Sequence, residues 1–166
     1  MAQLLSIPVV LILLGLQITV SNKFSIFNGF ADLLLLWLCA WIVQSKVKHS
    51  WVWFLVGILL TVFVSGLQWS AIVAGYGFIF ILGLFIKKRL WQSPLLSYYL
   101  VLIVGSLAFN YFAFYSLRFS GINLDMTEAL SLIIMPSLIL NLIFSFPIYL
   151  LAKDMTLWLF PYEEAE

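Results

Sequence analysis

The sequence predicts an all-α integral membrane protein with six transmembrane helices. The hydrophobic residues make up 64% of the 166 residues and the charged residues only 9%. A soluble domain carries about a quarter charged residues, so this chain cannot cover a globule with polar surface. Its apolar runs are continuous and do not alternate with polar residues, which excludes a membrane-spanning β-barrel.

Six apolar runs have, or approach, the roughly 17–25 residues that a helix needs to cross the hydrocarbon core. The predicted helices span residues 4–20, 30–44, 51–66, 70–86, 95–116 and 129–152. The second and third are short, so they either extend into their flanks or lie where the protein thins the bilayer. Together they form one domain over residues 1–155, followed by a juxtamembrane tail at 156–166. The first run lacks a basic start and a small-residue cleavage site, so we expect a retained helix.

Basic residues are distributed unequally between the two predicted sides of the membrane. One side carries Lys46, Lys48, Lys87, Lys88, Arg89 and Lys153, and the other carries Lys23 and Arg118. The positive-inside rule places the side with six basic residues in the cytoplasm, so we expect a multi-pass protein with both termini inside. The net charge of +1 provides no field that would attract nucleic acid.

Residues that could support catalysis are sparse. Asp32 is the only acid that approaches the membrane interior, and Cys39 and His49 are the only cysteine and histidine. General acid–base chemistry and metal binding both need several such groups close together. We therefore expect no enzyme, no cofactor and no metal, and a lipid-modifying enzyme is the least favoured function.

Asp32 stands directly before the apolar run of the second helix. A carboxylate there can cap free backbone N–H groups at the positive end of the helix dipole. It can also anchor a partner helix or loop on the outer side of the membrane. These two interpretations are compatible, and we expect Asp32 to start the second helix at the outer interface and to present that end to a partner.

Small residues recur at helical spacing on the third and fourth helices: Gly57, Thr61 and Ser65 on the third, and Ala71, Gly75 and Gly83 on the fourth. Such stripes let helix backbones approach closely within a membrane. Packing within the chain is the simpler explanation, and docking of a partner helix is the alternative. Because the link at 66–69 is tight, the two stripes favour a close hairpin.

Several polar side chains lie deep in the predicted helices: Gln17, Ser106, Asn110, Asn141 and Ser145. Amides in lipid need hydrogen-bond partners, so bonds between helices are the simpler interpretation. A pocket for a small polar ligand is the other. In that case the chain would be the vitamin-binding subunit of a membrane transporter, with Gln17, Asn110 and Asn141 as its polar contacts.

Two stretches resemble the bacterial rod-shape-determining membrane protein family MreD. The stretch "ADLLLLWLCAWI" at 31–42 is similar to the start of that family's second helix. The stretch at 57–89, with its Ser-Gly turn and Gly-Tyr pair, is similar to the third and fourth helices, and a basic loop and two long helices follow. The sequence departs from the family at Ala31, where proline is usual, and at Thr61, where an aspartate is frequent.

The resemblance implies a non-enzymatic scaffold or regulator of cell shape in the bacterial cytoplasmic membrane. Its partners would be an MreC-like protein, the glycan polymerase RodA and the elongation transpeptidase directly or through MreC, and the MreB filament indirectly. The implied fold is similar to the substrate-binding subunits of energy-coupling-factor transporters. Together with the small-residue stripes, the resemblance predicts a set of partner-binding residues: Asp32, Gly57, Thr61, Ser65, Gly66, Gly75 and Tyr76.

Overall fold

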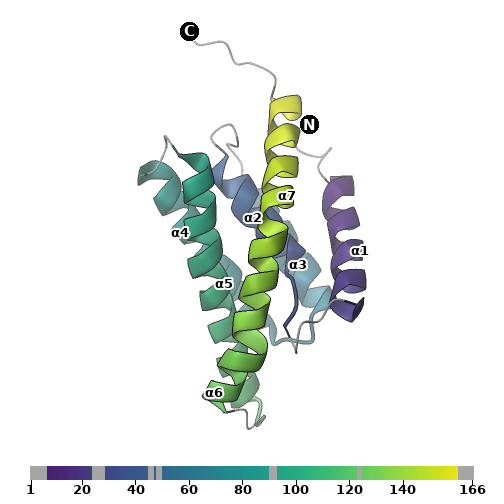
Figure 1. Cartoon of the computed structure of the whole chain (residues 1–166), viewed down its shortest axis with the longest axis vertical. Coiled ribbons are helices and arrows are strands. Elements are labelled where there is room, and N and C mark those ends of the chain that lie inside the picture. Colours follow the sequence, from purple (N-terminus) through teal and green to yellow (C-terminus); the bar gives the residue numbers. More distant parts are fainter. Residues whose placement is uncertain are drawn as a thin grey trace.

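The computed structural model describes residues 7–23, 29–44, 47, 50–89, 93–122 and 125–160. These residues form helices joined by short connections, which confirms the all-α prediction (Figure 1). The elements are α1 (Ile7–Lys23), α2 (Leu33–Val43), α3 (Ser50–Val64), α4 (Trp69–Arg89), α5 (Pro94–Phe119), α6 (Met126–Ala129), the π-helical turn η2 (Leu130–Ile134) and α7 (Met135–Leu159).

Each of the six predicted helices corresponds to a helical segment of the structure. The largest difference concerns the sixth helix, because α6, η2 and α7 follow one another without a break from Met126 to Leu159. The prediction that this helix ends at residue 152 was wrong, and the first four residues of the expected tail belong to α7. Residues 161–166 of that tail lie outside the described residues.

Three helices of the described chain are long and apolar enough to cross a membrane: α4, α5 and the continuous helix Met126–Leu159. They identify the chain as a membrane protein. The other helices are shorter, with 17 residues in α1, 11 in α2 and 15 in α3. At 1.5 Å per residue α2 is about 16 Å long, roughly half the thickness of a hydrocarbon core.

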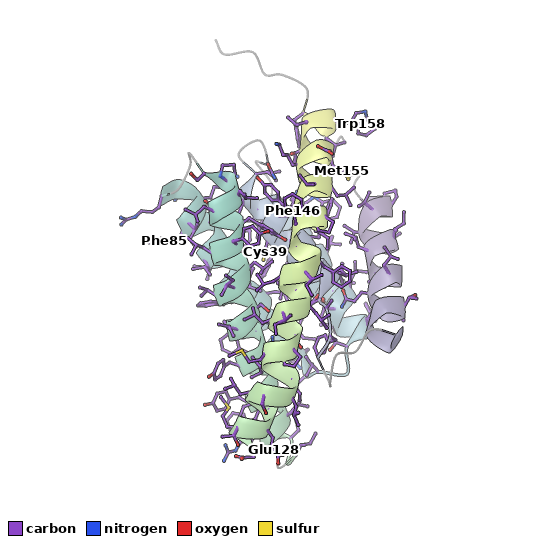
Figure 2. The ribbon with its side chains drawn as sticks, viewed as in Figure 1. Cys39, Phe85, Glu128, Phe146, Met155 and Trp158 are labelled. Atoms are coloured by element: carbon purple, nitrogen blue, oxygen red, sulfur yellow. The ribbon has the colours of Figure 1, made fainter. Side chains whose placement is uncertain are left out.

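Helix α2 occupies the centre of the bundle (Figure 1). All eleven of its residues are buried, and it packs against α1, α3, α4, α5 and α7. A helix that is hydrophobic on every side is stable only when it is surrounded. Its two tryptophans, Trp37 and Trp41, stack with ring centroids 5.2 Å apart. Figure 2 shows Cys39 of α2 inside the bundle, whereas Phe85 and Trp158 project from its outside.

Glycines on α3 and α4 let these helices approach α2. A Cβ added at Gly57 would lie 2.5 Å from Cδ1 of Leu38, and one added at Gly83 would lie 2.6 Å from Cγ2 of Ile42. The small-residue stripes are therefore packing surfaces within the chain. Gly57 and Gly83 contact α2 and Gly75 contacts α5, so the stripes do more than form the predicted α3–α4 hairpin.

The two ends of the bundle differ in charge. Lys87, Lys88, Arg89 and Lys153 lie where α4 and α7 end, which we call the basic end (Figure 1, top). The α3–α4 link and the turn between α5 and α6 lie at the opposite, far end. Arg118 lies in the last turn of α5, at the far end. The other three basic residues of the predicted asymmetry, Lys23, Lys46 and Lys48, lie in or beside stretches whose side chains are outside the described residues.

Candidate functional site

A short extended segment, residues 29–32, leads from the far end of the bundle to the start of α2. The N–H of Phe30 donates to Oγ of Ser137 at 3.1 Å, and the N–H of Asp32 donates to Oδ1 of Asn141 at 2.9 Å. Two residues of extended chain rise about 6.6 Å and four residues of helix rise about 6.0 Å. Alternate amides of the segment therefore match side chains one turn apart on α7.

Close contact with α7 holds the extended segment in place. A Cβ added at Gly29 would lie 2.6 Å from Cβ of Pro136 and 2.7 Å from the backbone nitrogen of Ser137. Backbone atoms cannot swing aside as a flexible side chain can, so only glycine fits this position without a shift of the helix. The segment and α7 therefore pack backbone against backbone beside the entrance to α2.

Asp32 is the N-cap residue of α2 and is 4% exposed. Its Oδ1 accepts the N–H of Leu35 at 3.0 Å, and the polar side chains of Tyr76 and Gln17 lie beside the carboxylate. Gln17 in addition accepts the N–H of Leu34 at 3.1 Å through its Oε1. The prediction that Asp32 starts the second helix is confirmed, but its expected place at the outer interface was wrong. It starts a helix inside the bundle.

Further hydrogen bonds extend this arrangement to the remaining helices. The hydroxyl of Thr61 donates to that of Tyr76 at 2.8 Å, which joins α3 to α4. The Nδ2 of Asn141 donates to Oγ of Ser106 at 2.9 Å, which joins α7 to α5. We call the six side chains that surround the start of α2 the polar cluster: Gln17, Asp32, Thr61, Tyr76, Ser106 and Asn141. It ties the start of the central helix to all five of its neighbours.

The other end of α2 is stabilised by a cation. Nζ of Lys87 on α4 donates to the carbonyl of Gln44, the C-cap residue of α2, at 2.6 Å and to that of Val47 at 3.2 Å. A positive charge is favourable at the C-terminal end of the helix dipole, as a negative one is at the N-terminal end. Asp32 and Lys87 thus stabilise the two ends of the same buried helix.

A cavity of about 310 Å³ lies at the far end of the bundle, beside the extended segment. Its wall includes Phe30, the α3–α4 link and the adjoining parts of α5 and η2. Most of the lining is apolar, and Asn110 is the buried polar side chain in it. Within the described part of the chain, no charged residue lines it.

The structure distributes the seven predicted partner-binding residues over three locations. Asp32, Thr61 and Tyr76 belong to the polar cluster. Gly57 and Gly75 are buried in contacts between helices. A Cβ added at Gly75 would lie 2.5 Å from the ring of Phe109. Only Ser65 and Gly66 reach the surface, where they line the cavity.

Two functional contacts have no counterpart in the sequence analysis: Ser137 beneath Phe30, and Lys87 at the end of α2. Both join residues separated by 40 or more positions, so no local spacing could reveal them. Among the described residues, no group of three or more His, Cys, Asp and Glu side chains is placed to hold a metal ion.

Comparison with protein-family models, curated proteins and solved structures finds no match to this chain. The resemblance to the MreD family therefore rests on the sequence stretches that suggested it.

Proposed function

We propose that the chain is a non-enzymatic scaffold of the bacterial cytoplasmic membrane that acts in cell-wall elongation, as its resemblance to MreD implies. In this proposal its helical segments cross the membrane six times, with the basic end and both termini in the cytoplasm. It binds an MreC-like protein within the membrane. RodA and the elongation transpeptidase join directly or through that protein, and the MreB filament joins indirectly.

The observation that carries the proposal is the bonding of the polar cluster within the chain. An ionisable residue inside a membrane protein is by default a candidate for a functional site. Here the carboxylate of Asp32 caps α2 through the N–H of Leu35, polar side chains of α1 and α4 lie beside it, and its backbone N–H is bonded by α7. A carboxylate held by its own chain in this way stabilises the fold. This favours a protein that acts through its surface.

The surface at the far end is the most suitable place for a partner. Phe63 and Trp69 flank the α3–α4 link and are 80% and 66% exposed. Gly66 between them is exposed, and a Cβ built on it meets no atom within 4 Å. The amphipathic ring of Trp69 favours the membrane interface, where a partner helix or loop can reach the open surface at Gly66. We therefore place the partner contact at Ser65 and Gly66.

The same contacts make a vitamin-transport subunit less favoured. Of the three amides expected to converge on such a ligand, Gln17 and Asn141 bond the backbone of residues 32–34. Only Asn110 lines the cavity. A polar vitamin would find one amide where several converging polar groups are needed.

Purification from the native membrane in mild detergent, followed by mass spectrometry of proteins and small molecules, tests the proposal. We expect an MreC-like protein and elongation enzymes to co-purify. Recovery of a pair of transport ATPases with a stoichiometric vitamin would contradict it.

Cysteine cross-linking tests the location of the contact. Cys39 is fully buried, so Cys39→Ala gives a background without thiols. Ser65→Cys and Gly66→Cys should cross-link to the partner, whereas the control Ile81→Cys, on an exposed part of α4, should not. Cross-linking through Ile81 alone would move the contact away from the far end.

A further inference from the structure

The far-end cavity has the size and lining of a small-molecule site. Ligand pockets occupy about 300–1,000 Å³, so a cavity of about 310 Å³ suits only a small ligand. Ala113, Phe114 and Leu117 of α5 and Ile133 and Ile134 of η2 form apolar walls. Because none of the described residues that line it is charged, they offer a charged ligand no compensation for its lost hydration.

Asn110 gives this cavity a specific polar contact. Its Nδ2 donates to the carbonyl of Ser106 at 2.9 Å, while its Oδ1 accepts no hydrogen bond from any described residue. The side chain is only 7% exposed. Asn141, one helix away, uses both atoms of its carboxamide within the chain. This oxygen is not among the fully enclosed polar atoms of the described residues, so a donor can reach it, and the cavity that Asn110 lines is a space from which a donor can come.

The order of residues along α5 defines how a ligand would lie. Asn110 is the innermost of the α5 residues that line the cavity, about 13 Å from the end of the helix at Phe119. The α5 lining between it and the far end is apolar. The ligand's polar tip must therefore point inward and its apolar body outward. A lipid acyl chain has the opposite arrangement, with its polar group at the interface.

We propose that the far-end cavity binds a small neutral molecule with a flat apolar body and one hydrogen-bond donor, of the class of indoles and phenols. Oδ1 of Asn110 accepts the donor, and Phe114 and Ile134 contact the body. The cavity shares Ser65 and Gly66 with the proposed partner contact, but binding of the small molecule needs only the chain itself.

A pair of probes that differ in the donor provides the test. The full chain is reconstituted in lipid nanodiscs, and binding of fluoroindole and fluorobenzofuran is measured by fluorine NMR, with empty nanodiscs to subtract partitioning into lipid. Fluorobenzofuran has a similar shape but no N–H. One neutral hydrogen bond predicts that the chain binds fluoroindole about 2- to 10-fold more tightly.

Variants assign that preference to the cavity. Asn110→Leu should abolish the preference, and the control Tyr111→Phe, on the neighbouring exposed position, should keep it. Ala113→Phe fills the cavity and should abolish binding of both probes. If Asn110→Leu does not fold, the comparison of the two probes on the unaltered chain and the Ala113→Phe result still test the proposal.

Three results would overturn the proposal: no saturable binding, equal binding of both probes, or binding that survives Ala113→Phe. Loss of fluoroindole binding when the chain is purified with its partner would show that a tryptophan or tyrosine of the partner fills the cavity. That result would also overturn the proposal that a free small molecule binds in the cavity. The first three results do not depend on whether an MreC-like protein is recovered, so the two proposals can fail separately.

Discussion

Replacing Asp32 with alanine should destabilise the protein by about 3 kcal/mol. Loss of an N-cap costs about 1 kcal/mol. The side chains of Tyr76, which is buried, and Gln17, which is half-buried, also lose the polar contact of the carboxylate, at about 1 kcal/mol each. The magnitude is the sum of these three contributions, each taken near the low end or middle of its range.

Asp125 offers a matched control for this substitution. It is also an aspartate at the N-cap position of a helix, α6, but it is exposed and makes no capping bond through its side chain. Asp125→Ala should change the stability by less than about 0.5 kcal/mol. Asp32→Asn keeps an acceptor oxygen for the N–H of Leu35 and should lose less than Asp32→Ala.

The free energy of unfolding can be measured by titrating the purified protein in mixed micelles with a denaturing detergent, with tryptophan fluorescence as the signal. Equal losses for Asp32→Ala and Asp125→Ala would refute the reasoning, because burial and bonding would then contribute nothing. An unchanged stability of Asp32→Ala together with loss of partner binding would instead favour the original interpretation of Asp32 as a partner anchor.

Three further predictions concern the surroundings of α2. Gly29→Ala should lower the free energy of unfolding by about 1–3 kcal/mol in the same titration, because the added Cβ meets the backbone of α7. The control Gly15→Ala, with open space around it, should be neutral or stabilising. Equal effects would show that the extended segment is loosely held. Lys87→Met should lower the free energy of unfolding by about 1–2 kcal/mol, because two carbonyls lose their cation. The control Lys88→Met, at an exposed position, should lower it by less than about 0.5 kcal/mol. The reverse order would refute the stabilising role of Lys87 at the end of α2. Cys39 should react with a maleimide only after unfolding, and rapid labelling of the folded protein would contradict the burial of α2.

The positions of the helices could be predicted from the sequence because long apolar runs and polar breaks are local signals. The capping role of Asp32 follows from the same local rules, and the structure confirms it. Hydrogen bonds between helices were also the simpler interpretation of Gln17 and Asn141, and both side chains make such bonds.

The burial of Asp32 could not be predicted in the same way. An aspartate before an apolar run looks the same whether the run begins at the membrane surface or inside the bundle. The difference is made by Ser137 and Asn141, more than 100 residues away, which bond the extended segment and let the helix begin late. Nothing in the spacing of either stretch indicates that pairing.

The ends of α2 explain why so many polar residues lie in this apolar protein. A helix buried on all sides cannot leave its terminal N–H and C=O groups to water, so neighbouring helices must supply the partners. Gln17 and Lys87 do this directly, Asn141 bonds the segment that enters α2, and Tyr76 lies beside the cap. Once these side chains are assigned to the ends of α2, Asn110 stands apart. Its Oδ1 serves neither end, and for that reason the search for a ligand should begin there.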